Sequence, residues 1–291
     1  MTTLTHTITA AAPAPVRVWP LVDIELSARL ERTEGRANAA FVEARARLQP
    51  ESGATWTEIA GTYAMFDGAG SMLTQTFGLG MSGPVSDGDF ARIEAFFTER
   101  GAEVFHEVSP LAGPEILERL NARGYRPVEL SSILYRPTAL PQDGTELPAG
   151  VRVRRVGADE VEAWAGVSAE GWSSEGEQIA EFVRGFGMIS ARAAGTECFL
   201  AEVDGRPAAA GVLILGDGAA LLAGASTIPS FRRRGAQHAL LQARLRFAAD
   251  AGFPVAMMGA LPGGASQRNA EREGFRIAYT RIKWHLQGSA A

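Results

Sequence analysis

The sequence predicts an α/β protein built as a tandem of two related halves. Strand-like and helix-like hydrophobic patterns alternate along its 291 residues, which is typical of helices packed on a sheet. Gly124-Tyr125 ends a short helical pattern and opens a strand, and Gly274-Phe275 repeats this arrangement 150 residues later. Between them, residues 137–150 contain three prolines and few bulky apolar side chains, which indicates a domain boundary. We therefore predict two halves of common design joined by a linker.

Composition and charge exclude several classes of protein. A net charge of −5 does not favour a nucleic-acid or anionic-membrane partner, and no apolar run approaches the length of a membrane-spanning helix. The single cysteine, Cys198, excludes an intramolecular disulfide and a cysteine-rich zinc site, and the histidines are too scattered to indicate a metal site. Residues 1–15 lack the basic and apolar regions of a signal peptide. We therefore expect a disordered leader and a cytoplasmic protein without a bound metal.

The first half, residues 16–137, begins with a long helical pattern at residues 21–48. Gly35 lies in its middle, and because glycine weakens a helix we expect two helices there. Ser86 caps a later helix, which ends at Gly101, a residue type that favours the left-handed backbone after a helix. The other predicted elements of this half are strands at 55–66, 73–81, 102–108 and 125–135 and a short helix at 114–123.

The second half, residues 151–291, follows the predicted linker at 138–150. Asp204-Gly205 is a strong signal for a two-residue hairpin turn between two apolar strands. A helix beginning at Ala236 places Leu241 and Leu245 on one face and closes at Gly252. The other predicted elements are strands at 151–156, 197–203, 207–215, 219–227, 255–258 and 275–285 and helices at 158–167, 178–193 and 265–273.

A basic turn lies between the strand at 219–227 and the helix that begins at Ala236. It runs Ile228-Pro229-Ser230-Phe231-Arg232-Arg233-Arg234-Gly235. The first amides of a helix lack intrahelical acceptors and carry a partial positive charge, and Gly235 allows φ > 0 and a close approach of the backbone. The pattern predicts a cradle for a phosphate or pyrophosphate group. The alternative, a merely solvated basic turn, does not account for the proline before it and the glycine after it.

The second half resembles the GNAT superfamily of N-acetyltransferases. The run from Arg232 to Gln237 is similar to the family's Arg/Gln-x-x-Gly-x-Gly/Ala phosphate loop and departs from it at Gln237, where the family usually has Gly or Ala. Ser266-Gln267-Arg268-Asn269 resembles the family's late helix, and Gly274-Phe275 resembles the exit from that helix. The resemblance covers residues 151–285.

The resemblance implies a mixed, mostly antiparallel sheet with helices on both faces in each half. In that family the strand before the phosphate loop splays from its neighbour and leaves a wedge for the pantetheine arm of acetyl-CoA. The implied cofactor is acetyl-CoA. The residues that would bind it are Ser226, Thr227, Ile228, Arg232, Arg233, Arg234, Gly235, Ala236, Gln237, His238 and Asn269.

The activity that the resemblance implies is transfer of an acetyl group to the amine of a small molecule by direct attack on the thioester. A backbone N–H of Thr227 or Ile228 would stabilise the oxyanion. Many family members have a tyrosine as the acid four residues before the Gly-Phe pair, and this chain has Ala270 there. The catalytic candidates are Asn269 and Ser266 for the sulfur, Glu175, Glu170 or Glu177 for the base, and Tyr279 as a distant acid.

The first half resembles the same family only in residues 87–135. Residues 81–87, where a phosphate loop would lie, contain no arginine, and Pro84 removes an amide donor. We predict that this half does not bind CoA and supplies structure or substrate walls. Three functions stay open: an N-acyltransferase, a non-catalytic acyl-CoA-binding or sensing protein, and a tandem enzyme with a vestigial first domain. We expect a monomer or homodimer whose partner is a small-molecule amine.

Overall fold

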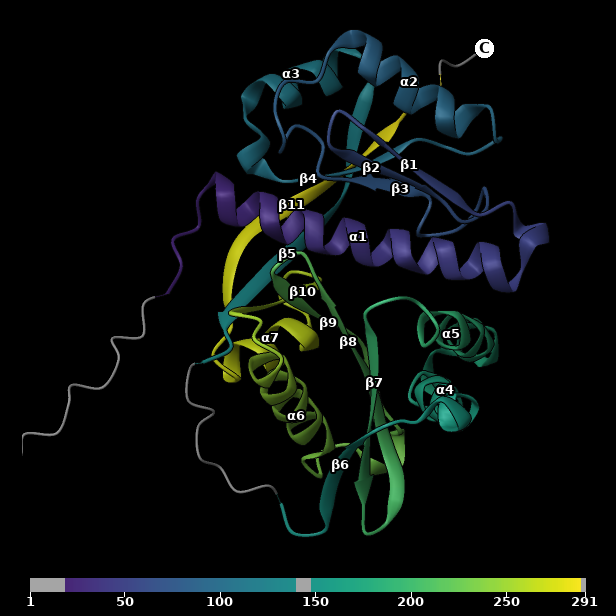
Figure 1. The fold of residues 1–291 in the computed structure, drawn as a ribbon, viewed down its shortest axis with the longest axis vertical. Helices are drawn as coiled ribbons and strands as arrows, with labels where there is room; N and C mark the ends of the chain where they lie inside the picture. Colours follow the sequence, from purple (N-terminus) through teal and green to yellow (C-terminus); the bar gives the residue numbers. More distant parts are fainter. Residues whose placement is uncertain (1–18, 140–147, 289–291) are drawn as a thin grey trace, which may run out of the picture.

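The residues that this computed structural model describes, 19–139 and 148–288, form one continuous sheet with helices on both faces (Figure 1). The sheet has 11 strands in the order β1-β2-β3-β4-β11-β5-β10-β9-β8-β7-β6. The neighbours β3–β4 and β9–β10 are parallel, and the other neighbours are antiparallel. The predicted mixed, mostly antiparallel sheet is therefore confirmed. The predicted leader and most of the predicted linker lie outside the described residues.

Most elements lie where the sequence predicts them. The helices are α1 (Ile24–Leu48), α2 (Asp87–Thr98), α3 (Pro114–Ala122), α4 (Val161–Glu170), α5 (Glu177–Ser190), α6 (Ala236–Asp250) and α7 (Ala265–Arg272). The strands are β1 (Thr55–Ile59), β2 (Thr62–Phe66), β3 (Gln75–Phe77), β4 (Phe105–Val108), β5 (Tyr125–Pro137), β6 (Val151–Arg155), β7 (Thr196–Val203), β8 (Arg206–Gly216), β9 (Ala219–Thr227), β10 (Val255–Ala260) and β11 (Arg276–Leu286).

The last strand of each half is exchanged into the other half. β5, from the first half, pairs with β10, and β11, from the second half, pairs with β4, where Lys283 lies opposite Glu107. β5 and β11 also pair with each other, from Tyr125 opposite Leu286 onwards. The two strands therefore cross together between the halves (Figure 1). The division of the chain at residues 138–150 stays a prediction, because the sheet itself runs across both halves without a break.

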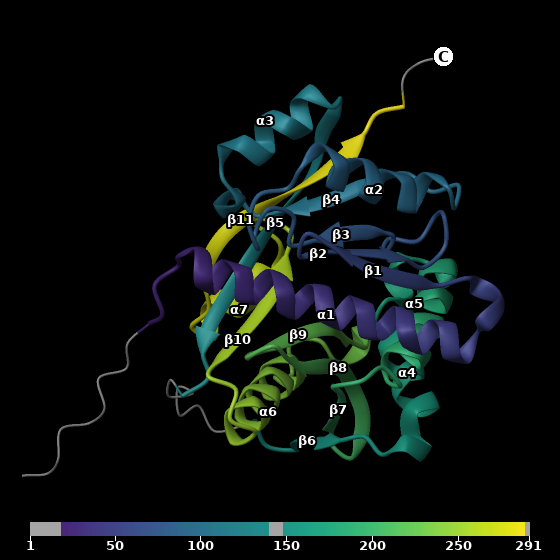
Figure 2. The same cartoon turned by 45° about the horizontal axis from the view of Figure 1, so that its top comes forward.

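Helices α1 and α4 cover one face of the second half's strands, α5 packs against both of these helices, and α6 covers the other face (Figures 1 and 2). Two successive residues of β8 show this arrangement. Gly211 faces Leu240 and Arg244 of α6, while Val212 lies on the side of Trp164 of α4, as alternate residues of a strand do. Because α1 also contacts β1, β2 and β3, it joins the two halves on one face of the sheet.

Three elements of the first half differ from the prediction. The strand predicted at 73–81 is only β3, Gln75–Phe77. The other two are the long helix, whose difference packing explains, and the strand at 55–66. α1 is one continuous helix of 25 residues, not two. A Cβ at Gly35 would lie 2.9 Å from Cδ2 of Tyr63 on β2, so the glycine lets the helix approach the sheet instead of breaking it. The predicted strand at 55–66 is a hairpin, because Ala60 and Gly61 have positive φ angles of 49° and 75° and reverse the chain.

Candidate functional site

A wedge opens in the sheet between β9 and β10. The two strands pair in parallel over residues 219–221 and 255–257, and they share no further pair in the described chain. β9 nevertheless continues to Thr227, and β10 continues to Ala260. The pairing of β9 with β8 has a bulge at the same place, where Gly224 has a φ of 54°, and a bulge bends and twists its strand. The splayed strand that the resemblance implies is therefore present.

Gly235 begins helix α6 directly after the turn that follows the wedge. It is the N-cap residue, with φ 81° and ψ −2°, and no side chain caps this helix end. The Ala239 amide donates to the Gly235 carbonyl (3.0 Å), so the amides of residues 236–238 precede the intrahelical ladder. A Cβ on residue 235 would lie 2.5 Å from Cγ of Pro148, which is a second reason for glycine here. The predicted positive φ at Gly235 is confirmed.

The three arginines of the turn make different contacts. Arg232 ties the turn to the chain after α4, because it donates to the Gly171 carbonyl (3.1 Å). Arg234 is paired with Asp204 in the β7–β8 turn. Arg233 is exposed, has a positive φ of 63°, and has no ion-pair partner among the residues that the structure describes. Of the three, Arg233 is therefore the cation that is available to an anion at the helix end.

The residue that departs from the family loop is held against the wedge strand. The Thr227 hydroxyl donates to Oε1 of Gln237 (3.3 Å), so this side chain lies at the end of β9. His238, the next residue, bonds through Nδ1 to Glu273 at the end of α7, and Gln242 donates to the same carboxylate. These bonds tie the first turns of α6 to α7.

The backbone at the end of β9 decides which amide can serve as an oxyanion donor. The Ile228 amide donates to the Ala208 carbonyl (2.9 Å) beside the β8–β9 ladder. Amides of successive strand residues point to opposite edges, so the Thr227 amide points away from β8 and towards the wedge. Of the two predicted donors, Ile228 is therefore wrong, and Thr227 keeps the geometry that the role needs. Ser226 is buried, and its hydroxyl donates to the Ser168 carbonyl (2.9 Å).

A cavity of about 720 Å³ lies at the wedge. Its lining includes stretches of the two wedge strands that do not pair with each other, residues 222–224 of β9 and 259–260 of β10. Helices α1, α4 and α5 supply much of the remaining wall, and Phe41 of α1 stacks on Phe186 of α5 with ring centroids 4.4 Å apart. A cavity of this volume can hold a drug-sized ligand. No sequence motif marks it, because its wall comes from both halves of the chain.

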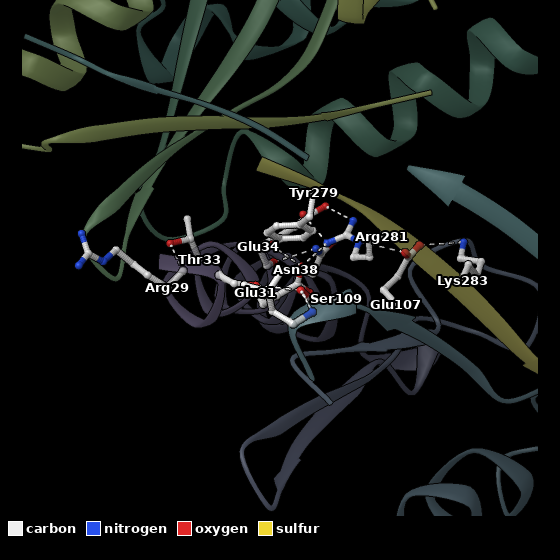
Figure 3. Close-up of polar contacts among 12 residues, drawn as sticks. Arg29, Glu31, Thr33, Glu34, Asn38, Glu107, Ser109, Tyr279, Arg281 and Lys283 are labelled. Carbon is white, nitrogen blue, oxygen red and sulfur yellow. Dashed lines mark hydrogen bonds and ion pairs between the residues drawn. The ribbon is translucent and has the colours of Figure 1, made fainter. Parts of the chain in front are cut away.

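One end of the cavity is acidic and lies where the exchanged strands cross. Arg281 of β11 lines it together with Glu34 of α1 and Glu129 of β5, and sequence analysis identified none of the three. The guanidinium donates to Glu34 (2.8 and 3.2 Å) and to Glu107 of β4 (3.0 Å), and it lies 3.5 Å from Glu31. Figure 3 shows Arg281 between the carboxylates of α1 and that of Glu107. Only the fold brings these charges together.

Burial changes the protonation of this network. It raises the pKa of Glu31 to about 7, although the charge of Arg281 acts in the opposite direction. Tyr279 donates from its hydroxyl to Glu31 (2.8 Å), and burial raises the pKa of this phenol well above its usual value. Tyr279 is therefore committed to the buried network and does not line the cavity, so its prediction as a distant acid is wrong.

The predicted catalytic residues lie in two places, and none of them lines the cavity. Ser266 is exposed on α7, and Asn269 is half-buried one turn further along the same helix. Glu175 ends a short 3-10 turn, and its amide donates to the carbonyl of Trp172 (2.9 Å), whose side chain does line the cavity. All three acidic candidates in residues 170–177 are exposed.

Solved structures share this architecture, although neither a known protein family nor a curated protein matches the sequence. A GCN5-related N-acetyltransferase from Kribbella flavida is similar over 86% of this chain and 96% of its own, with a TM-score of 0.61 and 20% identity. One from Sphaerobacter thermophilus is similar over 74% and 73%, with a TM-score of 0.51 and 17% identity. A tandem GNAT protein from the clavulanic acid biosynthesis pathway is similar over 77% and 74%, with a TM-score of 0.53 and 13% identity.

The chain has the GNAT fold. The second half carries the open GNAT wedge, and the corresponding place in the first half is closed. β3 ends at Phe77, directly after Thr76 pairs with His106 of β4. Ser86 caps α2 and forms a capping box with Asp89, so this helix end satisfies its own amides. The hydrogen bonds from Ser86 also lower the pKa of Asp89 to about 2. That the first half does not bind CoA stays a prediction.

A chain of hydrogen bonds runs through the closed wedge of the first GNAT half. The Thr76 hydroxyl lies 2.7 Å from Nδ1 of His106, and Nε2 of that ring lies 2.9 Å from the Tyr125 hydroxyl. Tyr125 donates to Glu94 (3.1 Å), which pairs with Arg123. We therefore assign the ring proton to Nε2 and the acceptor role to Nδ1. Burial lowers the pKa of His106 to about 3 and keeps the ring neutral.

Residues 19–139 and 148–288 do not support chemistry at a reactive cysteine or at a metal centre. Cys198 is buried on β7, and burial raises the pKa of its thiol to about 12, as befits a core residue. Within residues 19–139 and 148–288, no three His, Cys, Asp or Glu side chains are grouped so that they could hold a metal. None of the helices in these ranges is long and apolar enough to cross a bilayer.

Proposed function

We propose that the protein is an acetyl-CoA-dependent N-acyltransferase that moves an acetyl group to the amine of a small molecule. One observation carries the proposal. β9 is followed by the turn that leads to the uncapped start of α6, and residues 222–224 of β9, which do not pair with β10, line the cavity. A diphosphate and a thioester at two ends of one arm need these two environments. The likeness in fold to solved N-acetyltransferases supports the same assignment.

The chain's own groups would perform three tasks in this reaction. The amides of residues 236–238 and the Arg233 side chain would bind the diphosphate. The free edge of β9, with Ser226 and Ile228 beside it, would align the pantetheine arm. The Thr227 amide would donate to the thioester oxygen as negative charge develops there. When bound, acetyl-CoA supplies the acetyl carbon that the amine nitrogen attacks; the C–N bond forms and the C–S bond breaks.

Acid and base roles are assigned by position in this proposal. Glu175, beside Trp172 at the cavity, would take a proton from the substrate ammonium before attack. Asn269 and Ser266 of α7 would hydrogen-bond the departing sulfur. The reaction would leave the acetyl group on nitrogen and a proton on the CoA thiol.

A non-catalytic acyl-CoA-binding protein is the second candidate. It is favoured by Ala270, which is buried on α7 and cannot protonate a leaving thiolate where many GNAT enzymes have a tyrosine. Such a protein would bind acetyl-CoA but release no CoA when amines are added. Following thiol release with a panel of amines therefore separates the two candidates.

The cofactor assignment can be tested at Gln237 without straining the backbone. Gln237→Glu places an acid in the first turn of α6, where it favours the helix but repels a diphosphate. We expect the acetyl-CoA affinity to fall about tenfold or more, with no loss of melting temperature, as measured by calorimetry and thermal unfolding. Gln237→Ala restores a residue of the family loop and should keep the wild-type affinity. Equal affinities in the two variants would contradict the cradle assignment.

A further inference from the structure

The cavity at the wedge is shared by the two halves. The first half contributes Glu34 and Phe41 from α1 and Glu129 from β5, and the second half contributes α4, α5 and the wedge strands. The exchange of β5 and β11 and the stacking of Phe41 on Phe186 hold the halves in this relation. The half whose own wedge is closed therefore builds a wall of the space that the open wedge faces.

The wall of this cavity includes large apolar side chains that remain exposed to solvent. They are Met72, Trp172, Ile179, Phe182 and Leu261, with exposed fractions from 42% to 64%. Soluble proteins rarely leave such side chains together unless a ligand or partner covers them. Because all of them line one cavity, the simplest occupant is a ligand with an extended apolar body, which would remove this surface from water.

The polar end of the cavity favours a cation over an anion. Arg281 is the one cationic side chain that lines the cavity in the described chain, and three carboxylates already surround it. Glu34 and Glu129 line the cavity as well. Glu129 is 45% exposed, and its nearest cation, Lys283, lies 3.9 Å away. An ammonium group would add the positive charge that this end lacks, whereas an anionic ligand would meet repulsion.

This acidic end lies next to the wedge. Ala260, the last residue of wedge strand β10, pairs with Ser132 of β5. Glu129 lies three residues before Ser132 on β5, and Ser131, between them, also lines the cavity. A cationic group held at this end would therefore lie near wedge strand β10, which faces β9, the strand at which the thioester is proposed to lie, across the wedge.

We propose that the acceptor is an amphiphilic amine, an ammonium group on an extended apolar body, bound by both halves of the chain. Glu34 and Glu129 bind the ammonium, and the apolar wall with Phe182 binds the body. The role of this amine as an acceptor rests on the proposed acetyl transfer. The binding itself needs no acetyl-CoA and can be measured separately.

The first experiment is calorimetry on the full chain without cofactor, using octylamine, 1-octanol and ethanolamine as probes. Octylamine has both the charge and the apolar body, and each of the others has one of them. We expect octylamine to bind at least about tenfold more tightly than either. Equal affinity for octylamine and 1-octanol would overturn the role of the carboxylates, and equal affinity for octylamine and ethanolamine would overturn that of the apolar wall.

Charge variants then locate the ammonium. Glu129→Gln and Glu34→Gln should each weaken octylamine about fivefold to tenfold and leave 1-octanol unchanged. Glu107→Gln is the matched control, because Glu107 also bonds to Arg281 (3.0 Å) but does not line the cavity; it should change octylamine binding less than about twofold. If Glu107→Gln weakens octylamine as much as Glu34→Gln, the effect is structural and the assignment is wrong.

Apolar variants locate the body of the ligand. Phe182 and Val128 have the same exposed fraction, 51%, but only Phe182 lines the cavity. Phe182→Ser should weaken octylamine and 1-octanol alike, and Val128→Ser should weaken neither. Loss of binding in both variants, or in neither, would overturn the proposal. If amine binding follows these predictions but no thiol is released with acetyl-CoA, the acceptor site stands and the proposed acetyl transfer fails.

Discussion

The chain contains the same strand–helix–strand arrangement twice, and only the second copy is open. In the second half, β9 continues from residue 222 to Thr227 without pairing with β10, and α6 starts at Gly235 without a side-chain cap. In the first half, β3 stops at Phe77, and α2 starts in a capping box made by Ser86 and Asp89. The first half thus differs from the second by a shorter strand and by side chains that cap the helix end.

The first half, whose wedge is closed, contains a buried hydrogen-bond chain and forms part of the cavity wall. His106 lies at the single point where β3 pairs with β4, inside a hydrogen-bond chain that ends at the Glu94–Arg123 ion pair. On its other side, the first half presents Glu34 and Glu129 to the cavity of the second. We therefore propose that the second half binds the cofactor and that both halves bind the acceptor.

The largest expected effect on stability comes from His106 in the closed wedge. Its folded-state pKa of about 3 lies below the ordinary value of 6.5, so the unfolded chain takes up a proton as the pH falls while the folded chain does not. This contribution is therefore present above pH 6.5 and is lost towards pH 3, with a loss of about 3 kcal/mol by pH 4. His106→Gln can keep both hydrogen bonds without titrating and should not show this loss. Urea unfolding of both proteins at pH 7 and pH 4 measures it.

The test compares the change in unfolding free energy between pH 7 and pH 4 in wild type with the same change in His106→Gln. Glu31 acts in the opposite direction, because a carboxyl pKa raised from 4.5 to about 7 makes stability fall as the pH rises through that range. Wild type and His106→Gln share this contribution, so it cancels between them. If both proteins change by the same amount from pH 7 to pH 4, His106 is not held neutral in the fold.

A matched pair of glycine substitutions tests whether only the second wedge binds the cofactor. Gly235→Glu should weaken acetyl-CoA binding at least about a hundredfold, because it places a carboxylate at the start of α6 and a Cβ 2.5 Å from Cγ of Pro148. Gly83→Glu introduces the same charge at the closed site, where the backbone also has a positive φ of 133°, and should leave the affinity unchanged. Calorimetry should give one acetyl-CoA per chain, and a second site, or sensitivity to Gly83→Glu alone, would reverse the comparison.

The smallest effect is expected at the cap of α2. Ser86→Ala removes the side chain that accepts from the Asp89 amide (3.1 Å) and should lower the free energy of unfolding by about 1 kcal/mol. Acetyl-CoA affinity should stay at the wild-type value, because we predict that this helix end does not bind the cofactor. Denaturant unfolding and calorimetry on the same preparation measure both, and a change in affinity would connect the first half to the cofactor.

Local patterns predicted the features whose causes are local. The turn at Gly235, with its positive φ and helix start, follows from residues adjacent in sequence, as does the hairpin at Asp204-Gly205. The same local reading failed at Gly35, because a glycine that breaks an isolated helix can also be the place where a helix meets Tyr63 of a distant strand. Ile228 failed as an oxyanion donor because strand pairing with β8, not residue type, decides where its amide points.

The sequence by itself determined the α/β class, the order of the elements, and the turn at Gly235 that precedes α6, because turn, capping and periodicity preferences act over a few residues. Only the tertiary structure decided the exchange of β5 and β11, the closure of the first wedge, and the cavity with its acidic end. Glu34, Glu129 and Arg281 are up to 247 residues apart in the chain, and no local preference can bring them together. Their proximity results from the pairing of β5 with β11 and from the packing of α1 on the sheet.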